Sequence, residues 1–142
     1  MDNTKTRNFA ITEDYVSFET AKLLKEKGFD DVCRTFWKNW YNEKSLCECS
    51  SSHCFYYCTN AMLENYNDEN EMNIAAPTLQ MAMKWLREVY GLFIRITEDI
   101  TGNVFEWSVY QKNYGCKAST YVEDSYEQAC ETAIKYCLEN LI

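Results

Sequence analysis

Apolar residues recur at intervals of three and four in three segments of the chain, the spacing typical of helices that bury one face. The first segment, residues 18–27, follows Ser17, a good N-cap, and stops before Gly28, which suits the position after a helix end. The second is APTLQMAMKWLREVYG, with Pro77 in its first turn and Gly91 at its end. The pattern therefore predicts a helix in each segment.

The C-terminal segment carries the clearest helical pattern. Asp124 is expected to cap this helix, and Glu127 would complete an acidic version of the capping box. The apolar stripe consists of Tyr126, Ala129, Ala133, Cys137, Leu138 and Leu141. Cys130 and Cys137 lie on its inner side, where buried cysteine behaves as a small apolar residue.

Other segments alternate with a period of two, which indicates strands. VCRTFWKNWY and CFYYCTNAML are predicted to form a hairpin with a long, serine-rich connection between them. LFIRIT and VFEWSVYQ read as two further strands, joined through a tight turn at Gly102 and Asn103, and ASTYV as a shorter third one.

This order predicts an α+β fold, an antiparallel sheet with helices packed mainly on one face. We expect a single domain over residues 1–142. Its parts are a helix plus hairpin (1–63), an exposed polar loop (64–73) and a helix, three-strand, helix unit (74–142).

Composition and charge narrow the class of protein. The chain of 142 residues is 46% apolar, enough to build a core. Its formal net charge of -8, without a visible basic patch, argues against nucleic-acid binding. The N-terminus lacks the apolar core of a signal peptide, and no run approaches the roughly 20 apolar residues of a membrane span. We therefore expect a cytoplasmic protein with reduced thiols and no membrane partner.

The stretch CECSSSHCFYYC concentrates the side chains that could bind a metal: Cys47, Cys49, His53, Cys54 and Cys58. The spacing is not that of the usual zinc knuckles. If the second half is a strand, Cys54 and Cys58 lie about 13 Å apart, too far to share one ion. A zinc site is thus an alternative, and it requires residues 54–58 to form a loop or a helix. Half-buried structural thiols are the leading interpretation, and a disulfide within the loop stays open.

No catalytic constellation is visible. Any Cys-His or Ser-His enzyme must use His53, the only histidine, and the phosphate-loop and nucleophile-elbow motifs are missing. The acidic residues near the strand ends are interpreted as charged turns. We therefore predict a protein that is not an enzyme and has no catalytic residues.

Aromatic residues alternate to both faces of the proposed hairpin. One row would cover the core, and the other would be exposed, which is a signal of an interface. The interface candidates are Trp37, Trp40, Tyr41, Phe55 and Tyr57. The alternative is a sheet covered on both faces.

Three passages, YVSFETAKLLKEKGFDDVCRTFW, APTLQMAMKWLREVYGLFIRI and YVEDSYEQACETAIKYCLENLI, resemble small uncharacterised proteins of gut Bacteroides and of their phages and mobile elements. The resemblance implies no fold, activity or site residue. It does suggest an accessory protein of a phage or mobile element that binds a protein partner or itself, for host takeover or counter-defence. The alternative function is binding of a small ligand such as a nucleotide signal, or of zinc.

Overall fold

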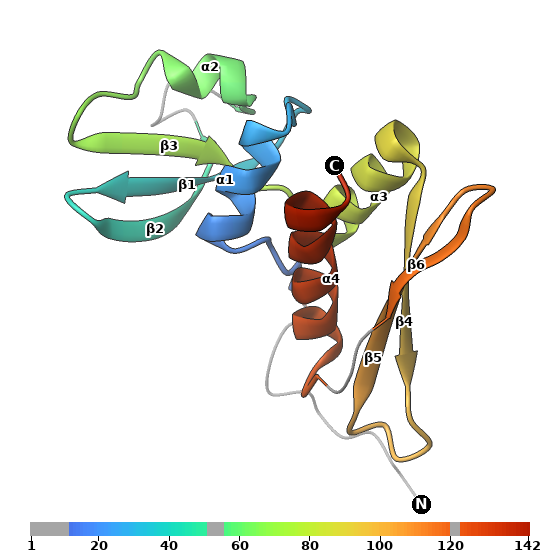
Figure 1. Cartoon of the computed structure of the whole chain (residues 1–142). Coiled ribbons are helices and arrows are strands. Elements are labelled where there is room, and N and C mark those ends of the chain that lie inside the picture. Colours follow the sequence, from blue (N-terminus) through green and yellow to red (C-terminus); the bar gives the residue numbers. More distant parts are fainter. Residues whose placement is uncertain (1–11, 51–55, 120–122) are drawn as a thin grey trace, which may run out of the picture.

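A computed structural model describes residues 12–50, 56–119 and 123–142 of the chain, which form helices and two antiparallel three-stranded sheets (Figure 1). The helices are α1 (Phe18–Glu26), α2 (Asn60–Glu64), α3 (Leu79–Tyr90) and α4 (Tyr126–Asn140). The strands are β1 (Thr35–Trp40), β2 (Glu43–Glu48), β3 (Glu71–Ala75), β4 (Leu92–Glu98), β5 (Phe105–Gln111) and β6 (Gly115–Ser119). The predicted α+β class is confirmed, but the predicted single sheet is divided into two.

The helix ends follow local side-chain chemistry. Ser17 caps α1 as predicted, because its hydroxyl accepts a hydrogen bond from the Thr20 amide. Gly91 ends α3 in the left-handed conformation, with φ at 66°. The cap of α4 is Ser125 rather than the predicted Asp124, a shift of one residue. In the described part of the chain, no helix has the length and apolar character required to cross a membrane.

The first sheet has the strand order β2-β1-β3, and the predicted hairpin was wrong in its second strand. The partner of β1 is β2, which lies inside the stretch assigned to the polar connection. The last four residues of the predicted strand, 60–63, belong to α2 instead. The prediction failed because β2 is an exposed edge strand and does not carry the apolar alternation of a half-buried one.

The predicted exposed loop 64–73 was also wrong at its end, since β3 begins at Glu71. Asn73 is buried in this strand, and its polar groups are satisfied locally. Its amide and its side-chain nitrogen both donate to Asn67 Oδ1, at 2.6 and 3.1 Å. The polar composition that suggested a loop therefore serves a hydrogen-bonded turn that leads into a strand.

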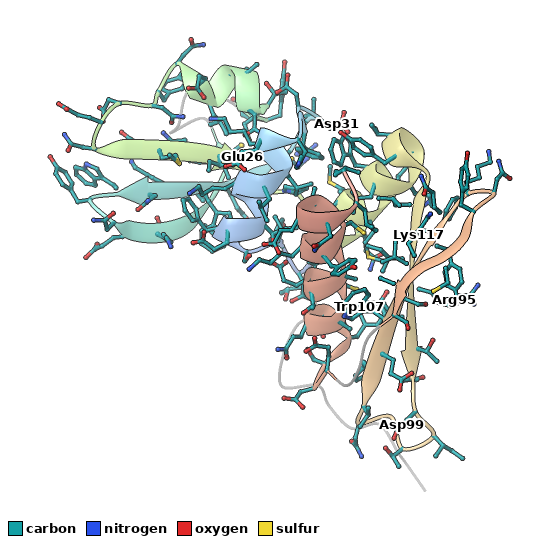
Figure 2. The ribbon with its side chains drawn as sticks, viewed as in Figure 1. Glu26, Asp31, Arg95, Asp99, Trp107 and Lys117 are labelled. Atoms are coloured by element: carbon teal, nitrogen blue, oxygen red, sulfur yellow. The ribbon has the colours of Figure 1, made fainter. Side chains whose placement is uncertain are left out.

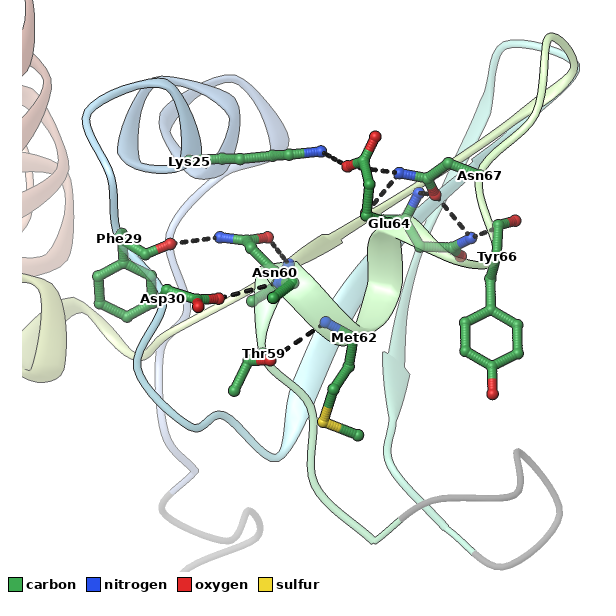
Figure 3. A network of polar contacts seen from close by, with 12 residues as sticks. Lys25, Phe29, Asp30, Thr59, Asn60, Met62, Glu64, Tyr66 and Asn67 are labelled. Carbon is green, nitrogen blue, oxygen red and sulfur yellow. Dashed lines mark hydrogen bonds and ion pairs between the residues drawn. The ribbon is translucent and has the colours of Figure 1, made fainter.

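Helix α2 is held in place by side-chain hydrogen bonds rather than by its length (Figure 3). The buried Asn60 amide donates to the Phe29 carbonyl at 2.8 Å and accepts from the Ala75 amide at 2.9 Å. Asp30 Oδ1 accepts from the Ala61 amide at 2.9 Å. These bonds join the loop after α1, α2 and β3 into one unit.

The second sheet has the order β4-β5-β6, and its first two strands lie where the sequence predicted them. Gly102, with φ at 71°, occupies the tight turn between them, and Asp99 accepts hydrogen bonds from Thr101 and Asn103 there. The acidic residue thus belongs to a charged turn, as predicted. On the inner face, Trp107 and Val109 are buried beneath α4.

The two sheets share one apolar core. Helix α4 lies between α1 and the second sheet and also packs on α3 (Figure 1). Buried residues of both sheets belong to the same cluster as those of the helices: Phe36 and Ile74 from the first, and Leu92, Trp107 and Val109 from the second. Cys130 and Cys137 are fully buried in this core, as their place in the helical pattern predicted.

A carboxylate connects the N-terminal and C-terminal parts of the chain. Glu131 of α4 accepts hydrogen bonds at the start of α1 from the Ser17 amide (3.1 Å), the Ser17 hydroxyl and the Thr20 hydroxyl (2.6 Å). A negative charge at this end of a helix is also favoured by the helix dipole. Glu131 thus adds a directional contact to the apolar packing of α1 on α4.

We expect Glu131→Gln to lower the free energy of unfolding by about 1–3 kcal/mol, since the bonds to a charged acceptor are weakened. Glu139→Gln is the matched control on the same helix. Glu139 only forms an exposed pair with Lys135, so its loss should cost no more than about 0.5 kcal/mol. Chemical denaturation measures both variants, and equal effects would contradict the role given to Glu131.

Candidate functional site

Two of the predicted interface residues, Trp40 and Tyr41, form the end of the β1-β2 hairpin. Their rings lie 5.5 Å apart, and 55% of Trp40 and 67% of Tyr41 is exposed to solvent. We call this pair the aromatic tip. Large exposed aromatic side chains are typical of interfaces, because they bury much area at little entropic cost when a partner binds.

The backbone of the aromatic tip is in a conformation that tyrosine rarely adopts. Tyr41 and Asn42 both have positive φ, 49° and 65°, and connect Trp40 directly to Glu43. Two such residues make a type I′ turn, for which Asn-Gly is the favoured pair. A left-handed residue with a Cβ costs about 1–2 kcal/mol, and asparagine relieves part of this cost by local hydrogen bonds. Tyr41 is therefore a locally unfavourable choice in this turn.

The remaining predicted interface residues divide into two groups. Trp37 is half-buried. Its indole nitrogen donates to the Val16 carbonyl at 2.8 Å, and its ring packs edge-on against Phe18 at 6.4 Å. It therefore packs against α1 rather than forming part of an exposed row. Tyr57 is exposed on a bend away from the regular strands, and Phe55 lies outside the described residues.

The charges around the aromatic tip are predominantly negative. The nearby lysines are engaged: Lys38 contacts Glu71 at 3.3 Å and the Trp40 ring at 5.4 Å, and Lys44 contacts Glu19 at 2.9 Å. The Lys44 ammonium group lowers the pKa of Glu19, first through their hydrogen bond.

Carboxylates near the aromatic tip lack such cations. Within the described part of the chain, neither Glu43 nor Glu69 forms an ion pair or a hydrogen bond through its side chain. Among the described residues, Asp68 accepts only from the backbone amides of Asn70 and Glu71, at 2.7 and 2.9 Å. A cavity of about 230 Å³ beside the tip is lined by Asn39, Tyr41, Asn42, Asp68, Glu69 and Met72, among others, and no lysine or arginine lines it.

The predicted metal-ligand set is only partly described. Cys47 lies on β2, Cys49 follows it, and Cys58 pairs with Cys33 through two backbone hydrogen bonds of 2.8 Å. His53 and Cys54 lie outside the described residues. Among the residues that the structure does describe, no three side chains of His, Cys, Asp or Glu are arranged to hold a metal ion. The zinc alternative therefore depends on His53 and Cys54.

Cys33 is the neighbour of Cys58 that sequence reasoning missed, because 25 positions separate them in the sequence. Burial raises the pKa of Cys33 to about 12 and also raises the pKa of Cys58. Burial likewise raises the pKa of Cys49, whose thiol lies 4.0 Å from the Cys33 carbonyl oxygen. Thiols with raised pKa values are poor nucleophiles, so this group supports a structural rather than a catalytic role.

Comparison with known proteins does not assign a function. No family model, curated protein or solved structure matches this chain. The function is therefore inferred from the chemistry of the surface, in which the aromatic tip combines exposed rings, an unfavourable turn residue and unpaired carboxylates.

We expect Tyr41→Asn to leave the free energy of unfolding unchanged or to raise it by up to about 1 kcal/mol, because asparagine suits the left-handed turn. Tyr114→Asn is the control. Tyr114 is 74% exposed on the β5-β6 turn but does not have a positive φ, so this change should bring no gain. Denaturant titration compares the two variants. A loss of more than about 1 kcal/mol in Tyr41→Asn would show that the tyrosine stabilises the turn.

The buried thiols should make the protein less stable in alkali. Burial raises the pKa of Cys137 to about 12, so the folded state keeps its proton while the unfolded chain loses it. Below the ordinary thiol pKa, Cys137 makes its full contribution to the free energy of unfolding. This contribution is lost as the pH rises from about 9 towards 12, by about 1 kcal/mol per pH unit. Cys137→Ala should reduce this slope in denaturation measured between these pH values. Cys116→Ala changes an exposed thiol and should leave the slope unchanged. Equal slopes in the two variants would contradict the role given to Cys137.

Proposed function

We propose that this protein binds a basic segment of another protein at the aromatic tip. The observation that carries the proposal is the exposed ring pair of Trp40 and Tyr41 on a turn whose backbone disfavours tyrosine. Backbone strain of this kind persists where function needs the side chain. The rest of the hairpin is a regular antiparallel ladder that fixes the position of the pair.

The chemistry around the aromatic tip favours a cationic partner. Arginine and lysine side chains stack on tyrosine and tryptophan rings and pair with carboxylates such as Glu43 and Glu69. The net charge of -8 would attract a basic partner over a longer range and increase the association rate at low salt. A second copy of the chain would bring like charges together, so we expect the isolated protein to be a monomer.

The resemblance of three sequence passages to proteins of Bacteroides phages and mobile elements suggests where this partner is found. We propose an accessory protein that acts in the cytoplasm of the host cell on a host protein, as in counter-defence or host takeover. The proposal includes no catalytic step and no cofactor.

Titration with short peptides of equal length tests the proposal. One peptide alternates Arg with Ala, and the other alternates Glu with Ala. Trp40 provides the signal, because it is the exposed member of the four tryptophans. We expect the Arg peptide to bind at least about tenfold more tightly than the Glu peptide and to weaken as salt is added.

Variants locate the binding site on the chain. Tyr41→Asn should weaken binding of the Arg peptide by about tenfold or more, as measured by calorimetry, because an interface hot spot is lost. The chain should stay folded. Tyr114→Asn should bind like the unmodified protein. Equal binding of both peptides, or full binding by Tyr41→Asn, would refute the proposal. If light scattering shows a dimer and Tyr41→Asn abolishes it, the partner at the aromatic tip is a second copy of this chain and not a basic segment of another protein.

A further inference from the structure

The outer face of the second sheet is a polar surface that the fold leaves open. Helix α4 packs on the inner face, and no described helix covers the other side (Figure 1). The strand register places Arg95 opposite Ser108, Ser108 opposite Ser119, and Thr97 opposite Glu106. Since side chains alternate along a strand, these five residues lie on the face opposite to the buried Trp107. Figure 2 shows Arg95 and Trp107 on opposite sides of the sheet.

These side chains surround a cavity of about 440 Å³, which is within the range of small-molecule sites. Its lining consists of Arg95, Thr97, Glu106, Trp107, Ser108, Tyr110 and Ser119. The guanidinium carbon of Arg95 lies 4.8 Å from the centre of the Tyr110 ring, a stacking contact that holds the side chain over the sheet.

The polar groups of this cavity form no ion pair or side-chain hydrogen bond within the described part of the chain. Arg95 forms no ion pair there, although the protein has 22 acidic residues. Within the same residues, the hydroxyl groups of Thr97, Ser108 and Ser119 form no hydrogen bond, and the Glu106 carboxylate is also unpaired. One fixed cation, three hydroxyl groups and one carboxylate thus face a common space.

We infer that this face binds a small phosphate monoester that also carries hydroxyl groups. A guanidinium group donates two parallel hydrogen bonds to a phosphate, and neighbouring serine and threonine hydroxyls can donate further ones. Glu106 is an acceptor only, so it suits a hydroxyl group of the same ligand rather than the phosphate.

The same charges argue against a longer polyanion. A nucleic acid requires several cations along its backbone, whereas this cavity has one, next to a carboxylate and on a protein of net charge -8. The site lies on the second sheet and the aromatic tip on the first, so this inference stands independently of the proposed protein binding.

Amide chemical shifts of the isotope-labelled full-length chain provide the test. The probes are ribose 5-phosphate, ribose, inorganic phosphate and a short single-stranded RNA. We expect ribose 5-phosphate to shift the amides of β4, β5 and β6 and to bind at least about tenfold more tightly than ribose or inorganic phosphate. Arg95→Gln should weaken binding about tenfold or more. Arg87→Gln removes an exposed arginine on α3 and should have no effect.

The outcomes that overturn the inference are distinct. Equal binding of inorganic phosphate and ribose 5-phosphate would indicate an adventitious ion only. Tighter binding of RNA would make the face a nucleic-acid surface, and unchanged binding by Arg95→Gln or no binding of ribose 5-phosphate would remove the site. Ser108→Ala leaves the guanidinium in place and should weaken binding by a few fold, so it keeps the test valid if Arg95→Gln does not fold.

Discussion

Helix α4 holds this fold together because each sheet alone is too small to bury a core. A three-stranded sheet becomes stable only when one face packs against another element. Here a single helix supplies this surface to the second sheet and, through α1, to the first. The contact between Glu131 and the start of α1 fixes how the two helices meet, since a carboxylate bound by one amide and two hydroxyl groups permits little rotation.

This arrangement decides which surfaces are available for recognition. The inner sides of both sheets are used by the shared core, whereas the end of the β1-β2 hairpin and the outer face of the second sheet are left open. The aromatic tip lies at the end of the first sheet, near the carboxylates of Glu43 and Glu69, which have no ion-pair partner among the described residues. The Arg95 cavity lies on the second sheet, and within the same part of the chain its guanidinium group forms no ion pair. The fold thus presents two chemically different surfaces, and regular strands position the side chains of both.

Part of the candidate site could be predicted from the sequence. The alternation of aromatic residues predicts Trp40 and Tyr41 as interface residues, and the structure exposes both. The same pattern predicts Trp37, but α1 covers its face of the sheet, which a pattern along one strand does not reveal. The pairing of Cys33 with Cys58 and the grouping of hydroxyl groups around Arg95 do not follow from the sequence pattern, because both groups assemble only when strands pair.

The sequence by itself determined the elements that depend on local chemistry: the capped helices α1, α3 and α4, the hairpin β4-β5 with its glycine turn, and hence the α+β class. Local hydrogen bonds and apolar spacing are sufficient for these. Tertiary structure alone decided that β2 and β3 flank β1, because polar residues form strands when neighbouring elements satisfy their hydrogen bonds, as Asn67 does for Asn73. Tertiary structure also decided that the strands form two sheets rather than one. This depends on which surfaces α4 covers, and those are set by the packing of the whole chain.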